Sequence, residues 1–426
     1  MSLVQCPTPA GSSGAGHLLD RMPDSAAAAG EDRIGALPDD IIRFVLSFLP
    51  SRESVCTCVL ARRWRNLWKS VPTVLIYDEE EARFVTSLLL LRDRVPLHEF
   101  VFTSFLNESE TPQDVEMWLR YAASCHVRVL RLDVESYDTT ARLRIPNMTL
   151  VCQHLTALYF SSLKLGGGTL DFSSCPVLEK LQMVNCEIHA EKILCQSLRR
   201  LVTYMCIFDG YARTRISCPS LTALELSENV GLTPFLESMP SLVTAFVEFD
   251  REWSEREELY DHCLDGGYYV GCGEWDCIPC HHIDREGDGC VLLDGLCGAT
   301  KLTLISAPKM IICTRDFKWR HIFCNLKTLH LSEWCLAADF SGLVYFLQHS
   351  PILERLTIQL SYYRQQPIDR KDETYGPRKQ FLVSKNLKVV KIKHRKNDER
   401  IHQIVMILVS LGVPPENINC SDCINF

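Results

Sequence analysis

The sequence predicts an α/β fold in three parts: an N-terminal helical unit, a long solenoid of parallel strands, and a C-terminal cap of one strand and one helix. Residues 32–72 carry apolar side chains at helical spacing, and residues 73–360 repeat one short apolar phrase. Residues 381–426 repeat that phrase once more before a final helical pattern, after a polar linker loop at 361–380. The Ser-, Gly-, Ala- and Pro-rich residues 1–31 are expected to form a disordered tail.

Composition narrows the classes of function. The net charge of −8 argues against a nucleic-acid binder, which usually has a basic face. No apolar run reaches about 18 residues, so we expect no contact with a membrane interior. Residues 1–31 lack the apolar stretch of a signal peptide, and the 21 cysteines are scattered as buried thiols would be. We therefore expect a protein of the cytoplasm, the nucleus or both.

Helix signals follow one another closely in residues 32–72. Pro38 suits a first helical turn, Asp39 and Asp40 complement the positive end of the helix dipole, and Pro50 ends the first helix. Three short helices bury little surface, so this unit either docks on a partner or caps the next domain. The apolar positions are Ile41, Ile42, Val45, Leu46 and Leu49, then Val55, Val59 and Leu60, then Trp64, Leu67 and Trp68.

This segment resembles an F-box, through Leu37-Pro38, Ile41-Ile42, the run from Leu46 to Pro50, Val59-Leu60, and the run from Arg62 to Arg65 with Trp68. An F-box binds the Skp-type adaptor of a cullin–RING ubiquitin ligase, so the resemblance implies this adaptor, and through it a cullin scaffold, as partners. Two positions depart from the motif: Cys56, where a basic or polar residue is common, and Ala61, where a Ser often caps the third helix. The adaptor-binding residues that the resemblance implies are Leu37, Pro38, Ile41, Ile42, Leu46, Leu49, Val59, Trp64 and Trp68.

Residues 73–360 repeat the pattern apolar-x-x-apolar-x-apolar. Most first positions lie 20 to 30 residues apart, which is the period and phrase of leucine-rich repeats. Each copy should give one short parallel strand, the returns should carry helix or irregular loop, and neighbours should stack into a curved solenoid. The copies begin at Leu97, Val127, Leu155, Leu178, Leu198, Leu221, Leu242, Ala299, Leu326 and Leu353.

The residue between the last two apolar positions of each copy should face the concave side. The predicted row is Val101, Arg131, Tyr159, Gln182, Val202, Glu225, Phe246, Thr303, His330 and Thr357. Tyr159 and Phe246 could anchor a protein partner, because aromatic residues are enriched at binding hot spots, or the row could simply cover the sheet. The candidate target-binding residues are Arg131, Tyr159, Gln182, Glu225, Phe246 and His330.

The C-terminal segment repeats the phrase at Leu387, Val390 and Ile392, and a helix is predicted from about residue 399 to 411. This helix is apolar on most sides, so we expect it to be buried as a cap on the last strands. Residues 381–426 resemble the FBD module that ends many plant F-box proteins with leucine-rich repeats. The likeness lies in residues 386–390, 398–400 and 414–416.

A cluster of Cys and His lies in residues 272–290. First positions Leu242 and Ala299 are 57 residues apart, so a Cys-rich loop is predicted to be inserted at about 250–293. A C-x-x-C pair supplies one zinc knuckle, but a second C-x-x-C or H-x-x-x-H is absent. We favour a loop without metal over a zinc site; the ligands of the zinc alternative would be Cys272, Cys277, Cys280, His282 and Cys290.

No phosphate-binding, nucleophile-elbow or H-E-x-x-H motif is present, so a binding module is favoured over an enzyme. The resemblance implies the substrate receptor of an SCF-type ubiquitin ligase, which needs no cofactor and does no bond chemistry itself. The F-box would hold the adaptor, the repeats would hold an unidentified target protein, and ubiquitin would be transferred by proximity. The alternatives are an adaptor-bound scaffold that degrades nothing and a zinc-binding protein that uses the 272–290 cluster.

Overall fold

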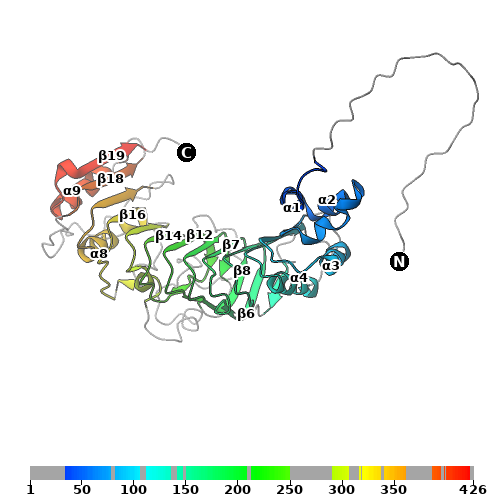
Figure 1. Cartoon of the computed structure of the whole chain (residues 1–426). Coiled ribbons are helices and arrows are strands. Elements are labelled where there is room, and N and C mark those ends of the chain that lie inside the picture. The colour runs from blue at the N-terminus through cyan, green and yellow to red at the C-terminus, as the bar shows by residue number, and fades with distance from the viewer. Residues whose placement is uncertain are drawn as a thin grey trace, which may run out of the picture.

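The structure, a computed structural model, describes residues 34–77, 82–105, 112–135, 142–146, 150–208, 213–249, 290–306, 316–317, 319–336, 340–360, 386–394, 398 and 400–422. These parts form an open arc with the N-terminal helices at one end and the C-terminal helix α9 at the other (Figure 1). Parallel strands line the inner, concave side of the arc along its length (Figure 1). The predicted tail, the linker at 361–380 and residues 250–289 of the inserted loop lie outside the described residues.

The N-terminal unit contains α1 (Asp39–Leu46), α2 (Ser51–Cys56) and two 3-10 helices, η1 (Thr57–Val59) and η2 (Arg62–Ser70). The third predicted helix is therefore 3-10, and Ala61 at its N-cap makes no side-chain hydrogen bond to its first turn. A small core holds the unit together: Ile42, Leu46, Leu67 and Val71, with Leu37, Leu49 and Trp64 packed against them.

The inner sheet joins each strand in parallel to the next repeat's strand, and the predicted concave row lies in register across it from Val101 to Thr357. The row begins at Leu75 and continues to Lys391 and Asn419. The strands are β1 (Thr73–Ile76), β2 (Glu99–Phe105), β3 (Val129–Glu135), β5 (Ala157–Ser161), β7 (Lys180–Val184), β9 (Arg200–Tyr204), β12 (Ala223–Gly231), β14 (Thr244–Phe249), β15 (Lys301–Ile305), β16 (Thr328–Ser332), β17 (Arg355–Gln359), β18 (Val389–His394) and β19 (Ile418–Asp422).

The outer side of the arc differs from the expectation of helix or loop, because its middle repeats return through a second parallel sheet. This sheet contains β4 (Arg144–Pro146), β6 (Lys164–Asp171), β8 (Glu187–Leu194), β10 (Ile207–Phe208), β11 (Arg215–Ser217) and β13 (Phe235–Leu236). Repeat length explains the difference. From Leu155 to Leu242 the first positions lie only 20 to 23 residues apart, which leaves no room for a helix.

Longer repeats do carry helices. The first positions Leu97 and Val127 are 30 residues apart, and α4 (Pro112–Ser124) lies between them. The 27-residue step from Leu326 to Leu353 contains α8 (Ser341–His349). Helices α3 (Ala82–Leu91) and α6 (Leu293–Leu296) cover the same outer side in their repeats. Short steps thus exclude an outer helix, but length alone does not select one, because the 28-residue step from Val127 to Leu155 contains the outer strand β4.

Buried thiols and one amide tie neighbouring repeats together. The Sγ atom of Cys152 donates to the carbonyl of Val127 at 3.4 Å, and the Sγ atom of Cys175 donates to that of Leu150 at 3.2 Å. Asn229 plays the same part by donating to Thr203 Oγ1 at 2.8 Å. Because these cysteines are unpaired and buried, the prediction of scattered thiols in the core is confirmed for them.

The C-terminal cap consists of β18, β19, α9 (Arg400–Ser410) and the 3-10 helix η5 (Pro415–Asn417). Ile404 and Leu408 of α9 are buried against the last strands. Met406 and Val409 are exposed, so the helix that was expected to be buried as a cap is buried on one face only. Apolar residues outside the buried stripe of a surface helix remain in solvent unless another layer covers them.

A buried charge cluster fastens this cap to the solenoid. Arg400 donates to Asp398 at 2.7 and 2.9 Å, and to Glu333 of the 3-10 helix η4 (Glu333–Leu336) at 3.1 Å. Burial acts to raise the pKa of Asp398, but the hydrogen bonds from Arg400 outweigh it and hold that pKa below its usual 3.8. The cap is therefore stabilised above about pH 4, where Asp398 is ionised in the folded and unfolded chain alike.

We expect Arg400→Gln to cost about 2–4 kcal/mol at pH 7, because the buried carboxylates of Asp398 and Glu333 lose the charged guanidinium that contacts both. A depressed folded-state pKa contributes stability that is lost as the pH falls through it, so the gap between wild type and variant should shrink below pH 3.8. Hydrogen exchange of α9 amides at pH 7 and pH 3 measures both values. A gap that stays constant between these two pH values would contradict the assignment.

Candidate protein-interaction surfaces

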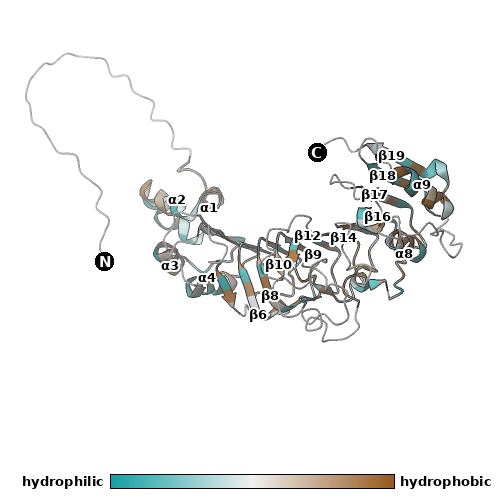
Figure 2. Ribbon diagram, turned by 180° about the vertical axis from the view of Figure 1, so that it is seen from behind, coloured by the Kyte–Doolittle hydropathy of each residue, from teal (hydrophilic) through white to brown (hydrophobic). Residues whose placement is uncertain are grey.

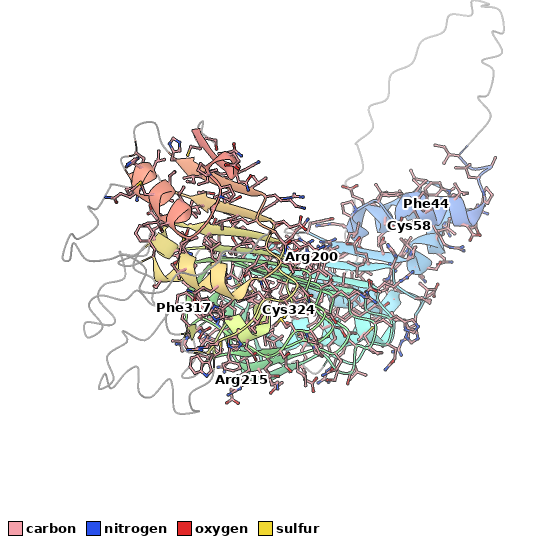
Figure 3. The ribbon with its side chains drawn as sticks, turned by 90° about the vertical axis from the view of Figure 1, so that its left-hand side faces the viewer. Phe44, Cys58, Arg200, Arg215, Phe317 and Cys324 are labelled. Carbon is pink, nitrogen blue, oxygen red and sulfur yellow. The ribbon has the colours of Figure 1, made fainter. Side chains whose placement is uncertain are left out.

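Helix α1 carries a second apolar stripe on the side that faces away from its core. Ile41 and Phe44 are 46% and 60% exposed, and Val45 and Phe48 continue the same side at helical spacing. The Phe44 and Phe48 rings stack edge to face with centroids 5.0 Å apart. We call these four residues the α1 stripe. Figure 3 places Phe44 at the outer end of the molecule, where no other part of the described chain covers it.

A second apolar surface follows η1 on the same helical unit. Val59 and Leu60 are 82% and 69% exposed, and they line an open hollow of about 900 Å³ together with Trp68 and Leu91. The cations Arg62, Arg65 and Lys69 also line this hollow. Large apolar side chains that stay in solvent beside basic ones are typical of a protein-binding surface.

Arg63 fixes the segment that leads into α1. Its guanidinium donates to the carbonyl of Gly35 at 2.6 Å and to the carboxylate of Asp39 at 2.7 Å. These two bonds bracket Leu37 and Pro38 from both sides. Arg63 is therefore a positioning residue: it holds the turn that presents Pro38 at the surface.

The concave face of the first repeats is built around Tyr159. The guanidinium of Arg131 lies 3.9 Å from the centroid of the Tyr159 ring, and the ammonium of Lys180 lies 4.7 Å from it. Arg131 is also bound to Glu99 at 2.8 Å. The result is a flat, half-buried aromatic surface whose cations are already engaged.

The middle of the concave face carries acidic groups. Glu225 accepts from Arg200 at 3.2 Å, and Glu248 accepts from Ser227 at 2.9 Å. Figure 3 shows Arg200 on the inner side of the arc and Arg215 of β11 on the outer side. Farther along, His330 contacts Gln359 at 3.1 Å, and burial, with the charge of Lys393, lowers the pKa of His330.

Comparison with known proteins finds family models that match the helical unit and the repeats. A family model described as the F-box domain matches residues 34–74. A model of the LRR repeats of FBD-associated F-box protein At5g56370 matches residues 115–258. F-box/LRR-repeat protein At3g03360 of Arabidopsis thaliana is 30% identical over 368 residues, which cover 77% of this chain and 70% of that protein. The chain belongs to the F-box/LRR-repeat family of plant proteins.

Further similar proteins also come from Arabidopsis thaliana. Putative FBD-associated F-box protein At5g56440 is 32% identical over 259 residues, which cover 51% of this chain. F-box/LRR-repeat protein At3g26922 is 30% identical over 256 residues, covering 51% of this chain and 82% of that protein. The match spans 59% of the length of At5g56440 and 48% of that of F-box/FBD/LRR-repeat protein At4g00160. Neither family model reaches residues 381–426, so their FBD-like character stays a prediction.

The predicted adaptor-binding residues differ in how far their side chains are exposed to solvent. Pro38, Ile41 and Val59 are exposed and available for contact. Leu37, Leu49 and Trp64 are half-buried, and Ile42, Leu46 and Trp68 are buried. Ile42 and Leu46 are interior residues of the small core, so we correct their expected direct contact to a supporting role. Trp68 is also buried, but it lines the hollow beside Val59 and Leu60, so its contact with an adaptor stays a prediction. Sequence reasoning missed Phe44, Phe48 and Leu60; the second helical stripe from Ile41 to Phe48 was the signal that could have found the first two.

The six predicted target-binding residues all lie in one half-buried row of the inner face. They are Arg131, Tyr159, Gln182, Glu225, Phe246 and His330. The structure thus brings them together along the arc, while their contact with a target stays a prediction. The cations two positions away in register, such as Lys180 and Arg355, also reach this face and were missed.

The zinc alternative is weakened at the one proposed ligand that the structure describes. Cys290 is buried, its sulfur accepts from the amide of Asp294 at 3.3 Å, and burial raises the pKa of its thiol. Zinc binds the thiolate, so this environment opposes ligation. Cys272, Cys277, Cys280 and His282 lie outside the described residues. Within the described parts of the chain, no group of three or more His, Cys, Asp or Glu could hold a metal ion.

The F-box is fastened rigidly to the first repeats. Arg92, at the end of α3, is buried and donates to the carbonyl of Trp68 at 3.2 Å and to that of Val71. Thr73 donates to the carbonyl of Ser47 at 2.9 Å. These bonds join the end of the F-box to the first strand.

No described helix of the chain has the length and apolar character needed to cross a bilayer.

Proposed function

We propose that this protein is the substrate-recognition subunit of an SCF-type cullin–RING ubiquitin ligase. The exposed face of the F-box binds a Skp-type adaptor, and the concave face of the repeats binds a target protein. The observation that carries the proposal is the α1 stripe: Ile41, Phe44 and Val45 stay in solvent on α1, and Phe48 stays in solvent in the turn that follows it, all within the matched F-box. A partner that covers these side chains removes their apolar surface from water, which favours binding.

The proposed mechanism requires no chemistry from this chain. The arc holds one surface for the adaptor and another for the target, and the buried Arg92 bridge keeps the two in a fixed relation. Tethering raises the effective concentration of the target's lysines near the conjugating enzyme, which is sufficient to accelerate transfer. We expect this assembly in the cytoplasm, the nucleus or both.

A substrate-trapping experiment tests this function. Proximity labelling is compared between wild type and Leu37→Ala with Pro38→Ala, a pair that truncates two side chains of the turn and leaves its bonds to Arg63 in place. Target proteins should accumulate with the variant and decline with wild type, because the variant binds them without delivering them. Equal abundance of every bound protein in both samples would support the scaffold that degrades nothing. Reconstituted transfer of ubiquitin to a trapped protein, present with wild type and absent with the variant, completes the test.

A further inference from the structure

The last four strands before the edge of the inner sheet carry an unusual set of charges. Strands β15, β16, β17 and β18 contain no Asp or Glu. Lys301, Arg355, Lys391 and Lys393 lie on the inner rows of these strands, at positions that alternate with the buried core residues. Strands β16, β17 and β18 lie together at one end of the arc (Figure 2). We call these four residues the basic strip. Each is exposed or half-buried, and among the described residues none has an ion-pair partner.

The cations on the earlier strands have partners within the sheet. Arg131 is bound to Glu99, Arg200 is bound to Glu225, and Lys180 lies over the Tyr159 ring. The same sheet therefore pairs Arg131 and Arg200 with carboxylates in the earlier repeats, whereas the four cations of the strip have no carboxylate partner among the described residues. Like charges gathered on one face repel one another, which costs stability unless an anion binds there.

The border of the strip does not supply that anion. Glu354 precedes β17, but its carboxylate faces Lys388 at 3.7 Å. Glu333 follows β16, but it is buried and bound to Arg400. His330 lies within the strip and contacts Gln359, which is uncharged. The described surroundings thus leave four positive charges for an external group.

We propose that the basic strip binds an acidic segment, rich in Asp and Glu, of the target protein. The inference rests on the proposed function and specifies its target surface. Guanidinium and ammonium groups form charge-assisted hydrogen bonds with carboxylates, and complementary charge fixes the register of a bound chain. An extended peptide suits the strip because three strands, β15, β17 and β18, present its four cations on one face.

A protein ligand fits these observations better than a nucleic acid. No Phe, Tyr or Trp lies on the inner rows of β15 to β18, so the stacking surface that single-stranded nucleic acids use is absent there. The neighbouring strands β12 and β14 carry Glu225 and Glu248, which would repel a continuing phosphate backbone. A short acidic stretch ends before it reaches them.

The test measures peptide binding to the full chain purified with its Skp-type adaptor. The probe is a fluorescent 12-residue peptide of Asp and Glu alternating with Ser, and its control has Asn and Gln at the acidic positions. Arg355→Glu with Lys391→Glu reverses two charges of the strip. Arg83→Glu with Arg144→Glu makes the same change in net charge at exposed positions of α3 and of the outer strand β4. Fluorescence anisotropy gives the dissociation constants, and thermal melts check folding.

The acidic peptide should bind wild type at least about tenfold more tightly than its neutral control, and added salt should weaken it. The strip variant should lose about tenfold, and the matched variant less than about twofold. Equal binding of both peptides, or equal losses in both variants, would overturn the inference. So would tighter binding of a single-stranded RNA that the strip variant also loses. If charge reversal prevents folding, Arg355→Gln with Lys391→Gln replaces it, with the same expected direction.

Adaptor co-purification separates this inference from the function on which it rests. The adaptor should remain bound to wild type and to both variants, because the basic strip lies at the far end of the arc from the F-box (Figure 1). If wild type fails to retain an adaptor, the proposed function fails. If the adaptor is retained and the peptides are not distinguished, only the acidic-target inference fails.

Discussion

Ile41→Asp with Phe44→Asp is expected to abolish adaptor binding and to leave the chain folded. Both side chains are exposed in the isolated chain, at 46% and 60%, so two carboxylates there cost the free protein little. Beneath an adaptor the same carboxylates would be removed from water without a partner, which should weaken binding at least about 100-fold. Calorimetric titration of the purified chain with the adaptor measures this loss, and thermal unfolding measures the cost to the fold.

The neighbouring residue on the opposite side of α1 is the matched control. Ile42 is 1% exposed, so Ile42→Ala should destabilise the F-box by about 2–4 kcal/mol through the cavity it leaves. Its effect on adaptor affinity should be smaller than that of the Asp pair whenever the F-box remains folded. A folded Ile41→Asp with Phe44→Asp protein that binds the adaptor within about threefold of wild type would exclude the α1 stripe as the contact surface.

Arg92→Met is expected to cost about 2–4 kcal/mol and to loosen the F-box from the repeats. Methionine keeps the apolar stem of the side chain but removes the guanidinium donors of the Trp68 and Val71 carbonyls, and the Trp68 carbonyl then keeps only the amide of Val71 at 3.4 Å. Burial already lowers the pKa of Arg92, which shows that its charge is held in a site that water scarcely reaches. Tyr121 lies in the same cluster, and burial raises its pKa to about 12.

Arg94→Met is the control, because Arg94 is exposed two residues farther along the chain. Hydrogen exchange at residues 68–76 should accelerate in Arg92→Met and stay unchanged in Arg94→Met. Under the proposed function, Arg92→Met should also slow ubiquitin transfer while the adaptor and the target still bind. Unchanged exchange in the Arg92 variant would show that the other contacts at this junction suffice to hold it.

Much of the solenoid is readable from sequence because its pattern is local. The apolar phrase fixes which residues enter the core, and the strand period of two then fixes the residue that faces the concave side. The predicted row from Val101 to Thr357 follows from these two rules and is confirmed by the strand register. The F-box helices are readable for a similar reason, since Pro38 and Pro50 mark their limits.

The remaining features depend on contacts between segments that are distant in the sequence. The spacing of the apolar phrase shows where a return is too short for a helix, but it does not choose between strand and helix in the longer ones: the 28-residue step from Val127 to Leu155 carries β4, and the 27-residue step from Leu326 to Leu353 carries α8. Glu333 and Arg400 are 67 positions apart and meet only after the cap folds onto β16 and α8. The sequence likewise does not show that Ile41 is exposed and Ile42 is buried, because both are apolar neighbours on one helix. Packing of the small core around Ile42 decides it.

The unbroken parallel ladder of the inner sheet makes the arc a lever arm. Ten strand-to-strand steps separate β1 from β17, which is about 50 Å at the usual spacing of parallel strands. A rotation of about 10° at the first step would move β17 by about 8 Å, because each repeat is oriented by its neighbour. Substitutions in central repeats that touch neither partner should therefore change which lysines of a bound target are modified.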